Sequence, residues 1–215
     1  KAVEVAGMTH DIGKAHPAFA GAIRDRNQIP PGTPLAKAPK GRWHGVRDMY
    51  NHSPLGERPG FRHELASALA ILELVWRVRP LHPALHGGRE AILDATVGRE
   101  LPDDADRLAV FEGILDELVG LDPAALNLIL YLVMCHHGKV RATVPMSPRD
   151  QDNVGPDGAL PVRGVRDGDE LPALMVANAG GQQFQLPEVK LRLDPARLGL
   201  SKRYGPSWVE RVLDL

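Results

Sequence analysis

The sequence predicts a mainly α-helical domain with long loops and one small inserted β-hairpin. Apolar residues recur at helical spacing in several stretches, which is the main signal for helices. The chain also has 22 glycines and 19 prolines among 215 residues, which predicts long or numerous loops. Two short apolar runs on either side of Gly180-Gly181 predict the hairpin. The composition is 43% hydrophobic and 25% charged, which is enough for a globular core.

The first half of the chain alternates between helix and loop. Residues 3–9 have the pattern of the last turns of a helix, which breaks near Gly13. Residues 24–62 carry many prolines and glycines and no periodicity, so we expect a long loop there. Helical spacing returns at Glu64 and stops at Pro80. The apolar positions of that helix are Leu65, Leu69, Leu72 and Trp76.

The second half contains three predicted helices, over residues 90–97, 104–119 and 123–137. The third has the clearest ends, because Asp122 is placed as the N-cap, a proline follows it, and Gly138 comes directly after the last residue. Its body is apolar almost all round, so we expect it to be a central buried helix.

Loop and strand follow. Residues 140–170 are rich in proline, glycine and aspartate and predict a loop. Residues 173–177 and 182–186 form the predicted strands of the hairpin, within an insertion over 141–190. A last helix is expected to begin at residue 206.

Charge, cysteine and hydropathy exclude several classes of protein. The formal net charge is −1, which excludes a basic nucleic-acid-binding tail and an acidic disordered protein. The single cysteine, Cys135, cannot form an internal disulfide, and its neighbours favour a small buried side chain. The single cysteine predicts a reducing, cytoplasmic location. The longest apolar run, over residues 128–135, is too short to span a membrane. Because amphipathic patterns run through both ends, we expect residues 1–215 to be a single domain cut from a longer protein.

Three short motifs carry the chemistry: His10-Asp11-Ile12-Gly13-Lys14, Arg62-His63-Glu64 and His136-His137-Gly138. The pairs His10-Asp11 and His136-His137 both lie where predicted helices end. Adjacent helical residues point about 100° apart, so only a helix end lets neighbouring ligands serve one site. Imidazole nitrogens suit transition metals, and a carboxylate can bridge two cations. We therefore predict that His10, Asp11, His63, His136 and His137 bind metal, with Asp11 as the bridge.

Two divalent ions are expected, and Mn, Fe, Co or Ni are favoured over Mg because the ligands are mostly imidazoles. Two ions about 3.5–4 Å apart lower the pKa of a bound water and clamp both reacting oxygens of a phosphodiester. Lys14 lies one turn after His10 and is expected to contact a non-bridging phosphate oxygen or to orient the water. Asp11 and Lys14 are thus the predicted catalytic residues.

These motifs, in this order, resemble the HD superfamily of metal-dependent phosphohydrolases. The closest match is the HD nuclease domain of the type I CRISPR-associated helicase-nuclease (the Cas three HD domain). The resemblance implies an HD-domain helical bundle that degrades single-stranded DNA with divalent transition metals. It also implies a superfamily-two helicase partner, fused or in trans, and a CRISPR surveillance complex. The family has one more ligand histidine upstream and a closing aspartate on a late helix, and we expect both to lie outside this segment.

The loop over residues 24–62 is a candidate DNA contact. It has eight basic residues against three acidic ones, with aromatic residues between them. Basic groups that follow phosphates and aromatics that stack on bases are typical of single-strand binding. Arg42, Trp43, Arg47 and Arg62 are the predicted contacts; the alternative is a solvated loop.

Two other functions stay open. One is an HD-superfamily nucleotide phosphohydrolase or cyclic-nucleotide phosphodiesterase, and the other is a catalytically inactive HD docking module. The remaining histidines are expected on the surface or in loops: His16, His44, His52, His82 and His86.

Overall fold

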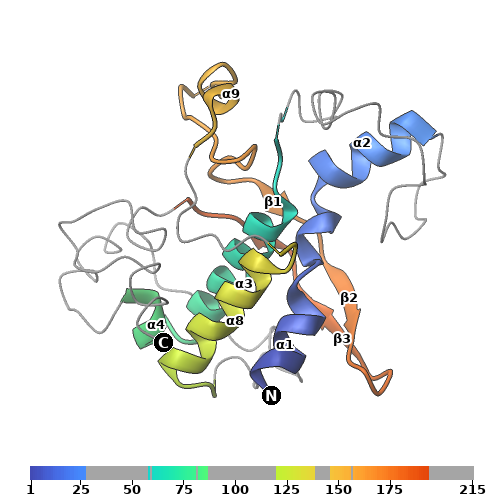
Figure 1. The fold of residues 1–215 in the computed structure, drawn as a ribbon, viewed down its shortest axis with the longest axis vertical. Coiled ribbons are helices and arrows are strands. Elements are labelled where there is room, and N and C mark those ends of the chain that lie inside the picture. Colours follow the sequence, from blue (N-terminus) through green and yellow to red (C-terminus); the bar gives the residue numbers. More distant parts are fainter. Residues whose placement is uncertain are drawn as a thin grey trace.

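The computed structural model describes residues 1–27, 58, 60–80, 82–86, 120–138, 146–155 and 157–193. Three helices form the framework: α1 (Ala2–Thr9), α3 (His63–Val78) and α8 (Pro123–Cys135). Figure 1 shows these helices side by side, with the strands β2 and β3 along the flank of α1. The described part of the chain is therefore mainly α-helical, with little strand, as the sequence predicts.

The central helix is α3. Every residue from His63 to Trp76 is buried, including two glutamates, because α3 packs against α8, the strand β4 (Val189–Lys190) and a short turn at Ile12–Ala15. The prediction that α8 would be the central buried helix is wrong. Leu128 is 37% exposed, although α8 packs on α1, α3 and the short helix α4 (Pro83–His86).

The ends of α8 confirm the cap prediction. The Asp122 carboxylate accepts a hydrogen bond from the backbone N–H of Ala125 at 2.8 Å, and a proline occupies the first turn. Gly138 has a φ of +72°, which favours glycine. The helix ends at Cys135, two residues before the predicted end, so His136 and His137 lie on the turn that follows it.

Two histidines predicted in surface or loop positions are fully buried helix caps. A short 3-10 helix, η1 (Ile12–Ala15), leads into α2 (Pro17–Asn27), and α4 is Pro83–His86. The His16 Nδ1 accepts the N–H of Ala18, and the His82 Nδ1 accepts the N–H of Ala84, each at 3.1 Å. Both rings are 0% exposed. The two sites share the sequence His-Pro-Ala, which explains this correction. The proline begins a helix, and the histidine ring accepts the N–H of the following alanine, which has no partner within the helix.

The hairpin is longer than predicted. The strands β2 (Leu174–Ala177) and β3 (Gln183–Leu186) confirm the two expected strands. The strands β1 (Glu170–Leu171) and β4 pair in the same register, so the hairpin runs from residue 170 to residue 190. Pro172 and Pro187 lie in the gap between the two ladders, where proline offers no N–H for pairing.

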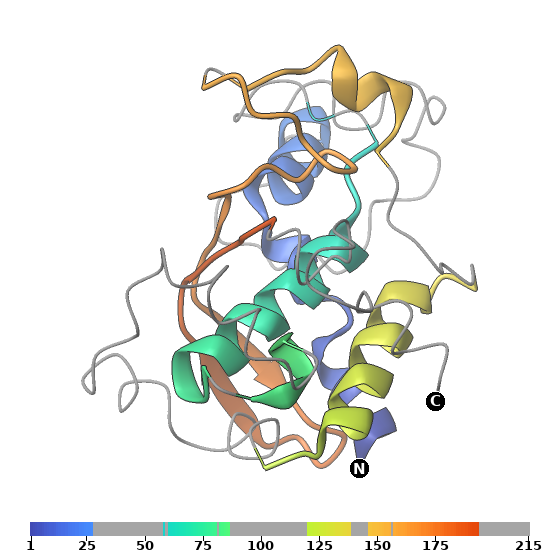
Figure 2. The ribbon, with the colours of Figure 1, turned by 90° about the vertical axis from the view of Figure 1, so that its left-hand side faces the viewer.

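The segment before the hairpin supports the start of α3. It contains α9 (Pro148–Gln151) where a loop is predicted, and Figure 2 shows α9 at the opposite end of the molecule from the hairpin turn. The buried Asp150 carboxylate accepts hydrogen bonds from the N–H groups of Ser147, Arg163 and Gly164. The Arg163 carbonyl in turn accepts the N–H of Arg62, which directly precedes α3.

Several predictions lie outside the described residues. They are the helices over 90–97, 104–119 and 206–215, the DNA contacts Arg42, Trp43 and Arg47, and the histidines His44 and His52. None of the helices in the described ranges is long and apolar enough to cross a membrane.

The lowered pKa of the Asp169 carboxyl predicts that acid destabilises the fold. Burial acts to raise its pKa, but contacts with His16, Arg58 and the Arg166 N–H outweigh burial and hold the pKa well below its usual value. Because the pKa of Asp169 is lower in the folded than in the unfolded chain, the ionised carboxylate stabilises the fold at pH values above its unfolded pKa of about 3.9. This stabilisation is lost as the pH falls toward the pKa of the folded state. We expect the free energy of unfolding to decrease as the pH is lowered below about 4.

This decrease should be shallower in Asp169→Asn, whereas Asp167→Asn, at an exposed ion pair with Arg192, should follow the wild type. Equal slopes for all three proteins, measured by urea unfolding, would contradict this.

Candidate metal centre

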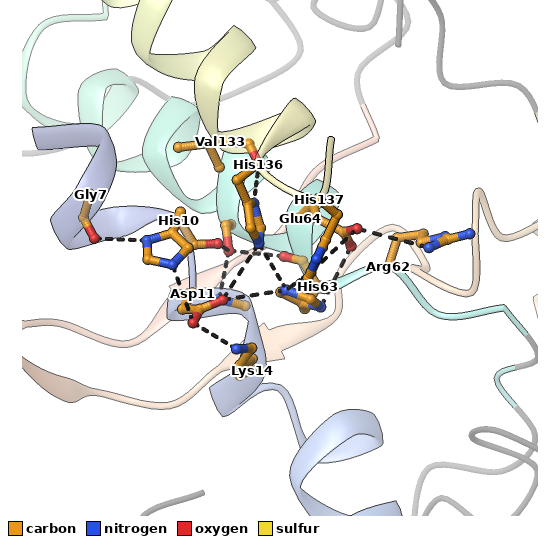
Figure 3. Close-up of polar contacts among 12 residues, drawn as sticks. Gly7, His10, Asp11, Lys14, Arg62, His63, Glu64, Val133, His136 and His137 are labelled. Carbon is orange, nitrogen blue, oxygen red and sulfur yellow. Dashed lines mark hydrogen bonds and ion pairs between the residues drawn. The ribbon is translucent and has the colours of Figure 1, made fainter. Parts of the chain in front are cut away.

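Five side chains from three distant segments meet between α1, α3 and α8 (Figure 3). They are the predicted ligands His10 and Asp11 at the end of α1, His63 at the start of α3, and His136 and His137 after α8. Their ligand atoms form two groups of three, each with all atoms within 4.8 Å of one another. The groups are His63 with His136 and His137, and His10 with Asp11 and His136. His136 belongs to both, so the two groups adjoin.

The three imidazoles of the first group have ligand spacing. The Nε2 of His63 lies 3.2 Å from the Nε2 of His137 and 3.4 Å from the Nε2 of His136. Nitrogens that bind one ion at about 2.1 Å lie about 3.0–3.4 Å apart. This group therefore has the dimensions of a metal site.

Asp11 lies between the groups. Its Oδ2 is 3.3 Å from the Nε2 of His10, while its Oδ1 is 3.4 Å from the Nε2 of His63 and 3.7 Å from that of His136. The two carboxylate oxygens thus face different histidines, which is the placement that a bridging ligand needs.

The helix ends orient two of the rings. The Nδ1 of His10 donates to the carbonyl of Gly7, and the Nδ1 of His136 donates to the carbonyl of Val133, each at 2.7 Å. The last carbonyls of a helix have no partner within the helix, so they are free to accept these bonds. With the proton of a neutral ring on Nδ1, the Nε2 lone pair points into the centre.

The charges favour the metal-binding forms. Burial lowers the pKa of His136 and of His137, so both rings stay neutral at physiological pH. Burial acts to raise the pKa of Asp11, but His63, Lys14 and His10 outweigh it and hold the pKa well below its usual value. The Lys14 ammonium binds Asp11 Oδ2 at 2.6 Å. The centre therefore combines the ionised Asp11 carboxylate with the neutral rings of His136 and His137.

Two carboxylate oxygens of the centre have no hydrogen-bond donor. They are Asp11 Oδ1 and Glu64 Oε2, both buried. A buried acceptor without a donor raises the free energy of the fold, and so do lone pairs that converge on one point. A divalent cation would satisfy Asp11 Oδ1 and the converging imidazole lone pairs, whereas Glu64 Oε2 lies beside the Nδ1 of His63. The ligand residues therefore fit a metal ion.

A protein-family comparison agrees with this geometry. The family model described as "Cas3, HD domain" matches residues 1–197. The chain belongs to the Cas3 HD domain family. It is therefore a CRISPR-associated HD-type nuclease domain by family, and the family suggests a metal-dependent hydrolase. No curated protein and no solved structure matches the chain.

In this Cas3 HD domain, the glycine of the first motif lets two ligand segments touch. The N–H of Gly13 donates to the Oγ of Ser67 at 2.8 Å. The Ser67 hydroxyl lies 2.8 Å from the carbonyl of His10 and 2.9 Å from that of His63. A Cβ at position 13 would lie only 2.1 Å from the His63 carbonyl oxygen. Gly13 and Ser67 therefore hold the backbone of His10 close to that of His63, and we call these contacts the Gly13–Ser67 lock.

Gly13→Ala is expected to separate these two segments. The new methyl group cannot avoid the His63 backbone, so α3 or η1 must shift. We expect a loss of about 1–3 kcal/mol in the free energy of unfolding, as for other overpacked sites. Gly7→Ala is the matched control, because nothing lies within 4 Å of a Cβ there and alanine favours its helix. Thermal unfolding of both variants measures the difference; equal melting temperatures would contradict the lock.

Sequence reasoning missed Ser67 and the role of Glu64. Glu64 is 3% exposed, and its carboxylate lies 3.5 Å from the Nδ1 of His63 and 3.9 Å from the Nε2 of His137. The Arg62-His63-Glu64 motif contains this signal, since a carboxylate next to a ligand histidine commonly orients it. Ser67 has no sequence signal. Arg62 is 36% exposed at the edge of the centre, with its guanidinium 3.9 Å from Glu64.

Proposed function

We propose that this domain hydrolyses phosphodiester bonds of single-stranded DNA in type I CRISPR interference, using two divalent ions. His10, Asp11, His63, His136 and His137 would hold them. The observation that carries this proposal is that two ligand groups adjoin, with the two oxygens of Asp11 facing different histidines. Two such ions supply a bound water of lowered pKa and positive charge at both reacting oxygens.

The residues around the centre favour a phosphate substrate. Four imidazole ligands and one carboxylate would leave two divalent cations with a strong positive charge, which would attract a phosphodiester. Lys14 holds Asp11 in place through its 2.6 Å contact. We propose that its ammonium also contacts a non-bridging phosphate oxygen or orients the attacking water.

The ligand set also supports a choice of metal. Imidazole nitrogens suit Mn, Fe, Co and Ni better than Mg, which prefers oxygen ligands. We therefore propose that a pair of these transition metals, rather than Mg, supports activity.

The near-neutral charge supports a partner that delivers the strand. A domain of net charge −1 gains little DNA affinity from electrostatics. We propose delivery by a superfamily-two helicase, fused or in trans, together with a CRISPR surveillance complex in the cytoplasm. Residues 1–215 would then act as one domain of a longer protein. Arg62, at the edge of the centre, would contact the strand, with Arg42, Trp43 and Arg47.

Cleavage of circular single-stranded DNA tests the proposal. The Mn²⁺-loaded domain should cut the circle, and EDTA or the double variant His10→Ala/Asp11→Ala should stop cleavage. Turnover of dNTPs or cyclic nucleotides with intact circles would instead support an HD nucleotide phosphohydrolase or phosphodiesterase. No turnover, with the same metal content in the wild type and the variant, would support an inactive docking module.

A further inference from the structure

A second buried polar cluster lies next to the metal centre and contains no predicted ligand. Its middle is the Asp169 carboxylate, just before the hairpin. Arg58 donates to it through both terminal nitrogens, Nη1 to Oδ2 at 2.7 Å and Nη2 to Oδ1 at 2.8 Å. The N–H of Arg166 donates to Oδ2 at 2.8 Å, and the Nε2 of His16 lies 3.2 Å from the same oxygen.

The cluster is fully enclosed. The side chains of His16, Arg58 and Asp169 are 0%, 4% and 7% exposed. Because the His16 Nδ1 accepts the N–H of Ala18, the proton of the neutral ring is on Nε2, which faces the carboxylate. The Asp169 backbone is fixed as well, since its carbonyl accepts the N–H of Leu191 at 2.7 Å. An ionised, bidentate contact of this kind has little freedom to rearrange.

The cluster joins the two chain segments that carry opposite sides of the metal centre. His16 comes five residues after Asp11, at the end of η1. Arg58 comes five residues before His63, and the His16 ring also packs on Phe61 with ring centroids 4.7 Å apart. Asp169 therefore contacts two segments at once. Through His16 it contacts the segment that follows His10 and Asp11, and through Arg58 it contacts the segment that leads to His63.

We propose that His16 and Asp169 are positioning residues of the metal centre, and that the Arg58–Asp169–His16 contacts fix the His10–Asp11 ligands relative to His63. This inference rests on the proposed metal site. The Gly13–Ser67 lock holds the same two segments at the ligands themselves, and the cluster holds them one step farther out. Losing a group that orients metal ligands commonly weakens metal binding by about 10–100-fold.

The chain supplies a matched pair of variants. His16→Asn keeps a good N-cap for α2 but is too short to reach Asp169, and it leaves the Arg58–Asp169 contact in place. His82→Asn makes the same change in the same His-Pro-Ala context. The Nε2 of His82 contacts the Leu121 carbonyl at 3.0 Å, before α8 begins and at the opposite end of α8 from His136. The two variants lose similar buried groups, but only one is tied to the centre.

Co²⁺ titration of the full chain tests the inference, with the Co²⁺ absorption spectrum reporting ligand geometry and thermal unfolding reporting stability. We expect His16→Asn to bind Co²⁺ about tenfold more weakly with an altered spectrum. His82→Asn should keep wild-type affinity and spectrum even if it is equally destabilised. Wild-type binding by His16→Asn, or the same loss in both variants, would overturn the positioning role alone. Absence of Co²⁺ binding by the wild type would overturn the proposed metal site and this inference together.

Discussion

Replacing His136 with alanine is expected to remove one ion from the centre. Its Nδ1 donates to the Val133 carbonyl, so the one lone pair on Nε2, which faces both Asp11 and His63, binds a single ion. Loss of a residue that merely orients a ligand weakens binding by about 10–100-fold, so loss of a ligand should weaken binding of that ion by more than about 100-fold. Metal content after dialysis against Mn²⁺, measured by mass spectrometry, checks this.

His137→Ala is the matched comparison, because it removes the neighbouring imidazole of the same centre. Each variant should lose one ion and keep the other. Both side chains are at least partly exposed at the end of α8, so neither variant should unfold the domain. Wild-type metal content in either variant would contradict the role of that histidine as a ligand.

Asp11→Asn is expected to abolish metal-dependent cleavage while leaving the metal-free fold nearly unchanged. The amide keeps the shape of the side chain but loses the charge that faces two groups of imidazoles. Cleavage of single-stranded DNA should fall at least about 100-fold, by the same reasoning as for His136. The Lys14 pair is partly exposed, so its loss should change the free energy of unfolding by no more than about 1 kcal/mol.

Thermal unfolding separates these two effects. Mn²⁺ should raise the melting temperature of the wild type, because a ligand that binds only the folded state stabilises it. The same Mn²⁺ concentration should leave the melting temperature of Asp11→Asn unchanged. An equal rise in both proteins would show that Asp11 is not a ligand.

The sequence predicts the ends of helices better than their burial. Asp122 and Gly138 mark α8 correctly, because capping depends on neighbours in the chain. The central position of α3 depends on which elements cover it, and that is a tertiary property. The placement of the predicted ligands has the same local cause: His10, Asp11, His136 and His137 all follow helix ends, where carbonyls orient two of the rings.

The supporting groups were not predictable in the same way. Ser67 is one of many polar residues in the chain, and only its contacts with the backbone of Gly13, His10 and His63 show why a hydroxyl is needed there. Asp169 lies more than 100 residues from Arg58 and His16, so no spacing rule connects them. His16 and His82 looked like loop residues, because proline and glycine around them conceal short helices.

Electron paramagnetic resonance of the Mn²⁺-loaded chain tests the central claim most directly. Two Mn²⁺ ions about 3.5–4 Å apart share bridging ligands and give a coupled spectrum, distinct from that of an isolated ion. The structure predicts two ions per chain and a coupled signal. One ion or none per chain, or only isolated-ion signals, would contradict a shared two-metal centre.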